Sequence, residues 1–160
     1  MLINPGSSLG GAIPKASVLD RSNHLWIAKF PSKADEGDIG AWKIVTYELS
    51  IASGINMAEC QARKFSSEYH TFLTTRFDRT NDGKRIHFTS AMTQLGYTDG
   101  ADAAAGVSYL ELVEFITSNG ANVKEDLHEL WRRIVFSICV SNTDVILSIK
   151  PTGFSVHLLR

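Results

Sequence analysis

The chain has 160 residues, of which 44% are hydrophobic and 21% are charged, with a formal net charge of -1. This length suits one domain with a hydrophobic core, and this composition excludes an intrinsically disordered chain. The balanced charge argues against direct binding to nucleic acid or a membrane, and the lack of a leader or a long apolar run predicts a cytoplasmic protein.

Short apolar runs separated by polar turns fill the first half of the chain. Residues 16–19 and 25–30 flank a polar turn and predict a β-hairpin. Residues 57–65, 71–77 and 84–88 predict further strands, the last of them after an Asn-Asp-Gly turn.

A helix is predicted between the hairpin and the later strands, over residues 39–52. Trp42, Val45, Leu49 and Ala52 recur at helical spacing. A glycine two residues beyond this range is a typical helix stop.

Helical periodicity dominates the second half of the chain. Ser108 and Glu111 have the spacing of a capping box at a helix start. Residues 127–139 carry the clearest apolar stripe, which comprises Leu127, Leu130, Trp131, Ile134, Val135, Ile138 and Cys139. The solvated side of the same helix is expected to comprise Glu125, Glu129, Arg132 and Arg133. A strand-rich half followed by a helical half favours an α+β fold.

The two cysteines, Cys60 and Cys139, both lie among apolar residues, which predicts two buried thiols. Neither belongs to a C-x-x-C motif or a Cys/His cluster. No metal site is therefore predicted from these residues.

Two segments near the amino end have the chemistry to bind phosphate. The glycine-rich segment 6–12 would let backbone N–H groups approach a phosphate closely, although a flexible turn is the commoner explanation of such a segment alone. Lys29 lies inside an apolar strand, where a buried ammonium group needs an anion. The alternative for Lys29 is an edge-strand lysine that points at water.

Two later segments also have alternative explanations. Residues 75–79 form either an ion-paired strand end of little energetic value or part of a site. Asp144, which follows the strongest helix, is either a turn residue or a general base for a hydroxyl nucleophile. The order of all four segments, from glycine-rich turn and strand lysine to a late aspartate, is that of the parts of a protein kinase.

Several separated motifs resemble the HipA family of bacterial serine/threonine kinases. GSSLGGAIPKA at 6–16 is similar to the family's phosphate loop, LWIAKF at 25–30 to its lysine strand, and FLTTRFDR at 72–79 to its hinge. LWRRIVF, running into SNTD within 130–144, is similar to the approach to the catalytic loop. The resemblance covers residues 4–144 and is specific because the motifs occur in the right order.

The resemblance implies a protein-kinase-like fold of the HipA type. We expect an N-lobe β-sheet with its helix, followed by the first helices of an incomplete C-lobe. Residues 4–80 would form the strand-rich nucleotide-binding lobe, residues 84–144 the helical lobe, and residues 145–160 an aberrant apolar tail. All of them would belong to one partial kinase domain, 1–160.

The activity that the resemblance implies is ATP-dependent phosphorylation of protein serine or threonine, by the toxin component of a toxin–antitoxin system. Asp144 matches the catalytic base, and Ser8, with Ser7 as second candidate, matches the autophosphorylated serine of the phosphate loop. The implied ATP-binding residues are Gly10, Gly11, Ala12, Lys29, Thr75 and Phe77. The implied cofactor is ATP with magnesium, and the implied partners are a DNA-binding antitoxin and a translation-related protein substrate.

The sequence departs from the family's pattern at two places. Residues 145–160 contain no Asn, Asp or Glu, so the oxygen ligands that magnesium requires are missing there. Lys43 stands where relatives favour an acid that pairs with the strand lysine, and Glu48 would face another way. We therefore expect a catalytically incomplete chain, truncated at both ends, with an out-of-frame tail.

Two other interpretations remain open. One is a non-catalytic, pseudokinase-like interaction module. The other is an unrelated small α+β binding protein with chance motifs. The run at 145–149 is apolar and β-prone, and the tail stands in place of the lobe that would normally cover the helix at 127–139. We therefore expect exposed apolar surface and self-association.

Overall fold

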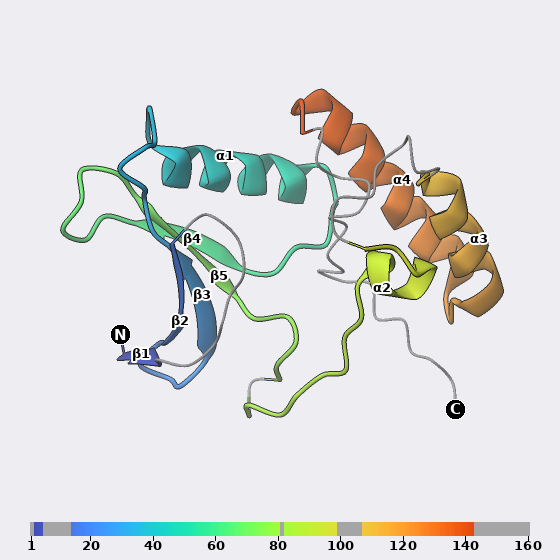
Figure 1. The fold of residues 1–160 in the computed structure, drawn as a ribbon, viewed down its shortest axis with the longest axis horizontal. Coiled ribbons are helices and arrows are strands. Elements are labelled where there is room, and N and C mark those ends of the chain that lie inside the picture. The colour runs from blue at the N-terminus through green and yellow to red at the C-terminus, as the bar shows by residue number, and fades with distance from the viewer. Residues whose placement is uncertain (1, 5–13, 81, 99–106, 143–160) are drawn as a thin grey trace. The chain divides into compact units, whose positions relative to one another are not determined.

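The computed structural model describes residues 2–4, 14–80, 82–98 and 107–142. The chain forms two compact units (Figure 1). The first unit comprises Met1–Ile51 and Met57–Ile86, and the second comprises Ala52–Asn56 and His87–Arg160.

The first unit is built on an antiparallel five-stranded sheet (Figure 1). Its strands are β1 (Leu2–Asn4), β2 (Lys15–Leu19), β3 (Leu25–Lys29), β4 (Cys60–Arg63) and β5 (Thr71–Thr75). They lie in the order β1-β2-β3-β5-β4, so β5 inserts between β3 and β4. The predicted hairpin is confirmed as β2 and β3.

Three details of the sheet differ from the sequence prediction. The strand predicted at 84–88 is wrong, because only an isolated bridge joins Arg79 and Arg85 there. The strand predicted at 57–65 shortens to β4. The three-residue β1 was not predicted, because so short a run has no period of its own and becomes a strand only by pairing with β2.

The turn between β2 and β3 is organised by Asp20. Its Oδ1 accepts hydrogen bonds from the backbone N–H groups of Ser22 (2.8 Å) and His24 (2.9 Å), and its Oδ2 accepts one from Trp26 Nε1 (3.2 Å). Asn23 adopts a positive φ of 63°, which asparagine tolerates in turns. The polar turn predicted between the two strands is thus a tight, side-chain-bonded loop.

One face of the sheet carries the hydrophobic core of the first unit. Val18, Trp26, Ala28 and Leu73 are buried, and Ala16 and Phe30 pack against them. Leu73 is completely buried, with 0% of its surface exposed. Because side chains alternate along a strand, Lys29 and Phe72 emerge on the opposite face.

Helix α1 (Ile39–Ala52) has the predicted bounds but not the orientation that its apolar stripe suggests. Trp42 and Leu49 are 68% and 51% exposed, and Val45 is exposed as well. Gly40 and Ser50 are the buried residues of this helix. The spacing of apolar residues therefore predicted a helix correctly, while the packed side is the one with the smaller and more polar residues.

The second unit contains three helices among its described residues: α2 (Ala91–Leu95), α3 (Tyr109–Asn119) and α4 (Val123–Cys139). The predicted capping box is present at the start of α3, where Glu111 Oε2 accepts from Ser108 N at 3.0 Å. Leu112, Ile116 and Leu130 form the buried core between α3 and α4. No helix in the described ranges combines the length and apolarity needed to cross a membrane.

The solvated side predicted for α4 is wrong in part. The carboxylate of Glu129 binds Arg133 (2.7 Å) and accepts from Asn56 N (3.2 Å), and both charged side chains are mostly covered. Trp131 and Ile138 are instead 64% and 73% exposed, and the predicted burial of Cys139 is also wrong because this thiol is exposed. The expectation of exposed apolar surface is met here on α4.

Candidate functional site

Lys29 lies at the end of β3, which has β2 and β5 as neighbours. The alternative of an edge-strand lysine is therefore wrong. The side chain is half-buried, and its Nζ lies 5.7 Å from the centroid of the Phe72 ring. This distance permits a cation–π attraction, which holds the ammonium group against the sheet.

A second lysine emerges directly opposite Lys29. The register of β2 and β3 pairs Lys15 with Lys29, so both side chains leave the same face of the sheet. We call this surface the Lys29 face; by register β2 to β5 contribute Lys15, Ser17, Leu19, Leu25, Ile27, Lys29, Cys60, Ala62, Phe72 and Thr74 to it. Burial raises the pKa of the Cys60 thiol, which disfavours the thiolate form.

Helix α1 is fastened to the start of β5 through Asp38 and His70. Asp38 Oδ1 accepts from the backbone N–H groups of Ala41 and His70, each at 3.0 Å, and Asp38 Oδ2 lies 2.5 Å from His70 Nδ1. Gly40 abuts the same histidine: a Cβ added there would come within 2.7 Å of the His70 carbonyl carbon. The first turn of α1 is thereby fixed beside the sheet.

The packed side of α1 presents Lys43 rather than an acid. Lys43 follows Gly40 by three residues and precedes Ser50 by seven, so it lies on the side of α1 that these two buried residues define. Burial lowers the pKa of Lys43, Asp35 opposes this change, and the positive charge of Lys15 lowers the pKa further. Glu48 is exposed, in agreement with its predicted different direction.

The Asp38–His70 contact predicts an acid-sensitive fold. Burial alone would raise the pKa of Asp38, but hydrogen bonds from the His70 side chain and from two backbone N–H groups lower it to about 2. Because the unfolded chain binds this proton first, the stabilisation by Asp38 is complete above pH about 4 and is lost as the pH falls towards 2. Asp38→Asn should therefore flatten the fall in unfolding free energy between these values, measured by urea denaturation.

Glu48→Gln is the matched control for that experiment, because it removes a carboxylate from the exposed side of the same helix. An acid profile altered equally by both substitutions would show that the bonds to His70 are not responsible.

Thr75, predicted to contact adenine, is the last residue of β5. Its backbone N–H donates to Glu59 O (2.9 Å), and the next N–H, of Arg76, donates to Leu25 O (3.0 Å). Thr75 is therefore anchored between β4 and β3, and Phe77 begins the loop that leaves the sheet. The register pairs Thr75 with Trp26 and Phe72 with Lys29, so this segment lies at the opposite end of the β3–β5 pair from Lys29.

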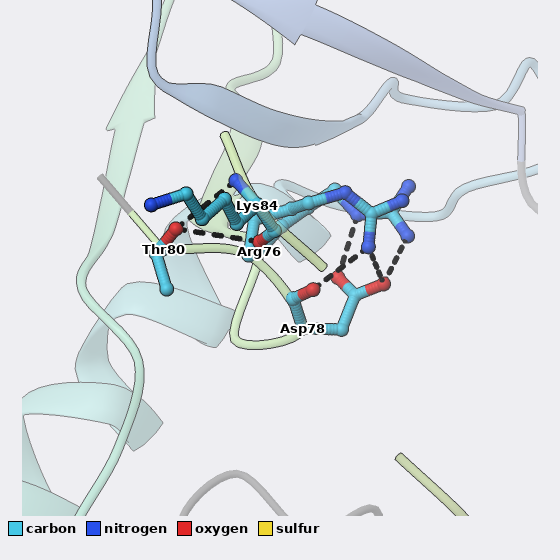
Figure 2. A network of polar contacts seen from close by, with 5 residues as sticks. Arg76, Asp78, Thr80 and Lys84 are labelled. Atoms are coloured by element: carbon cyan, nitrogen blue, oxygen red, sulfur yellow. Dashed lines mark hydrogen bonds and ion pairs between the residues drawn. The ribbon is translucent and has the colours of Figure 1, made fainter. Parts of the chain in front are cut away.

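An aspartate between two arginines braces that loop. Arg76 Nε and Nη2 donate to the two oxygens of Asp78 at 2.8 and 2.6 Å, as Figure 2 shows, and Arg79 Nη1 donates to Asp78 Oδ2 at 2.7 Å. The three side chains are mostly covered. The hydrogen bond from Arg76 lowers the pKa of Asp78, and Asp78 in turn raises the pKa of Arg76.

The same loop is closed by backbone bonds as well. Asp78 O accepts from Ile86 N, and Lys84 O accepts from Thr80 N, both at 3.0 Å; Thr80 Oγ1 also accepts from Lys84 N (Figure 2). Bidentate, partly buried ion pairs contribute more to stability than the exposed pairs that the sequence alone suggested.

The structure brings together only part of the predicted site. Lys29, Thr75 and Phe77 belong to the first unit and lie on or next to neighbouring strands. The other predicted residues lie outside the described ranges: Ser7, Ser8, Gly10, Gly11, Ala12 and Asp144.

Sequence reasoning missed two residues that position α1. Asp38 had a usable signal, because an aspartate directly before a helix is a common N-cap. His70 had none, since its role depends on a partner 32 positions away in the chain. The described residues also contain no group of three His, Cys, Asp or Glu side chains suited to a metal ion.

Comparison with known proteins gives a consistent result. A family model described as the HipA-like C-terminal domain matches residues 7–145. A curated Haemophilus influenzae protein named "Putative kinase" is 25% identical over 157 residues, which cover 88% of this chain and 46% of that protein.

A solved structure is similar to most of this chain. It contains HipA and HipB of the Shewanella oneidensis MR-1 toxin–antitoxin system in complex with operator DNA. The matching chain has a TM-score of 0.67 and 21% identity, and the match covers 88% of this chain and 38% of that one. The predicted α+β, protein-kinase-like fold is confirmed. The chain spans about half the length of the curated relative, 46%, and 38% of the solved chain.

Proposed function

Because the chain belongs to the HipA-like C-terminal domain family, we propose that it is the nucleotide-binding part of a HipA-type, ATP-dependent serine/threonine kinase. The observation that supports this most directly is Lys29. It is a half-buried lysine on a central strand, held by Phe72 of the neighbouring strand, and that strand leads into the braced loop at 76–79. In kinases a lysine on such a strand binds the phosphates; here Lys29 lies opposite Phe72, three residues before the end of the neighbouring strand.

Each predicted residue has a proposed role in this function. Gly10, Gly11 and Ala12 would let backbone N–H groups approach the phosphates, and Lys29 would bind the α- and β-phosphates. Thr75 and Phe77 would contact adenine, and Asp144 would act as the base for the attacking hydroxyl. Ser8, with Ser7 as second candidate, is the proposed site of autophosphorylation.

The proposed partners follow the family. They are a DNA-binding antitoxin and a translation-related protein substrate, in a toxin–antitoxin system. The self-association expected through residues 145–160 stays a prediction, because that segment lies outside the described ranges.

Neither the described residues nor the sequence of residues 145–160 offers a set of ligands that suits magnesium. The described residues contain no cluster of carboxylates that could hold it, and the sequence from 145 to 160 offers none. Divalent magnesium requires hard oxygen ligands, usually carboxylates. No step of the proposed function is therefore assigned to a metal bound by this chain.

A non-catalytic, pseudokinase-like interaction module is the second candidate function. It is favoured by Lys43, which occupies the packed side of α1, and by the lack of acids after Asp144. Transfer of labelled phosphate from ATP to the chain or to a substrate protein separates the two candidates. Incorporation would support the kinase, and nucleotide binding without transfer would support the module.

Lys29→Met is expected to abolish most of the stabilisation that ATP confers. A nucleotide at a hundred times its Kd stabilises the folded protein by about 2.7 kcal/mol, which raises Tm by roughly 5–10 °C. Removing the ammonium while keeping an unbranched side chain should eliminate most of this rise, measured by differential scanning calorimetry with and without ATP.

Lys124→Met is the matched control, since it removes one positive charge from an exposed position on α4. It should retain the nucleotide-dependent rise in Tm. No rise in the unsubstituted chain, with or without magnesium, would refute nucleotide binding.

A further inference from the structure

The carboxyl-terminal half of α4 carries an exposed row of large apolar side chains. Trp131, Val135 and Ile138 follow one another at spacings of four and three residues, so they lie on one side of the helix, and all three are exposed. We call this row the Trp131 stripe. Another side of the same helix is packed, because Leu130 belongs to the core shared with α3. A contiguous apolar row on a helix that is already packed elsewhere is typical of a surface that binds a further segment.

The end of α4 turns the chain away from the helix axis. Ser141 adopts a positive φ of 54°, and its N–H donates to Ile138 O at 3.1 Å. The next N–H, of Asn142, donates to Ser137 O at 2.9 Å. These two bonds around a left-handed residue form a Schellman motif, in which the following residue commonly touches the last turn of the helix. The described chain therefore ends beside the last turn of α4 and does not continue along its axis.

The apolar run Val-Ile-Leu-Ser-Ile at 145–149 begins only three residues later. Residues 142–144 span at most about 10 Å when extended, which is about the diameter of a helix, so residue 145 can reach any side of the last turn. Trp131 and Ile138 lie about 10 Å apart along the helix axis, and five extended residues span about 16 Å. The run is therefore close enough and long enough to follow the whole stripe.

We propose that residues 145–149 bind along α4 and cover the Trp131 stripe of the same chain. Side chains alternate along an extended segment, so Val145, Leu147 and Ile149 share one side. These three would pack on the three apolar side chains of the stripe, while Ser148 would point away from the helix. The removal of apolar surface from water on both partners is the driving force.

A second copy of the chain is the competing occupant of the stripe. A segment that is joined to its binding surface by a few residues has an effective concentration in the millimolar range. A second copy at about 1 µM is about a thousandfold more dilute than that. The run of the same chain should therefore fill the stripe first, and two copies would associate through it only when the run leaves.

The test is acrylamide quenching of tryptophan fluorescence in the full chain carrying Trp42→Phe. Because Trp42 is exposed and Trp26 is buried, Trp131 is then the tryptophan whose quenching reports on the stripe. We expect Trp131 to be shielded from acrylamide. Leu147→Asp should abolish this shielding and shift the emission to longer wavelength, because a carboxylate resists burial on an apolar surface. Leu158→Asp is the matched control, since it places the same charge outside the run, and it should leave the shielding unchanged.

Light scattering of the same samples at several concentrations identifies the occupant. Shielding that is present in a monomer and independent of concentration would support the cover by the same chain. Three results would overturn it: quenching of Trp131 as strong with the unsubstituted run as in urea, equal effects of Leu147→Asp and Leu158→Asp, or shielding that appears only as dimers form. The last result would make a second copy the occupant. If circular dichroism shows that Leu147→Asp does not fold, the quenching and the mass measured with the unsubstituted run decide the question.

Discussion

Gly40→Ala is expected to destabilise the protein by about 3 kcal/mol, the upper end of what overpacking costs. A Cβ at this position would come within 2.7 Å of the His70 carbonyl carbon, and backbone atoms cannot move aside as a side-chain end can. At other positions inside a helix, alanine stabilises the folded protein by about 1 kcal/mol relative to glycine. A loss of stability in Gly40→Ala would therefore by itself indicate the close contact with His70. Urea denaturation followed by circular dichroism measures it.

Gly37→Ala is the matched control, because a Cβ at Gly37 would meet nothing within 4 Å. It should leave the unfolding free energy within about 0.5 kcal/mol of its original value. If Gly40→Ala were as stable as the unsubstituted protein, α1 would not abut His70.

Leu73→Ala is expected to cost about 2–5 kcal/mol of unfolding free energy, because it leaves a cavity in a fully packed core. Leu73 is 0% exposed and lies on β5 among Val18, Trp26 and Ala28. Its neighbour Phe72 emerges on the opposite face and contacts Lys29. Disorder of β5 would therefore also weaken nucleotide binding, which calorimetric titration would detect.

Leu110→Ala removes the same atoms from a side chain that is 71% exposed on α3. This control should change stability by less than about 0.5 kcal/mol. Equal losses in the two variants would contradict the assignment of the buried core to the Leu73 side of the sheet.

The braced loop after β5 illustrates how a motif gains meaning from its geometry. In the sequence, Arg76, Asp78 and Arg79 are three charged residues at a strand end, a common surface feature. In the structure both oxygens of one carboxylate are bound by guanidinium groups, and the backbone of the loop is closed by Ile86. Alternation of charge along a sequence cannot reveal this, because it does not show whether water or protein covers the pair.

The sequence by itself determined the elements that depend on local physics. The hairpin of β2 and β3, the bounds of α1 and the Ser108–Glu111 capping box all follow from spacing, turn residues and caps within a few positions. The motif at 25–30 also made Lys29 a candidate site residue, because an ammonium group that is buried in an apolar strand needs an anion.

Only the tertiary structure decided which surfaces these elements share. Insertion of β5 between β3 and β4 makes the strand of Lys29 a central one. The contact of Gly40 with His70 turns Lys43 inward and the Trp42 stripe outward, although apolar periodicity suggests the reverse. The physical reason is that periodicity records the spacing of side chains along one element, whereas packing depends on partners that are distant in the sequence.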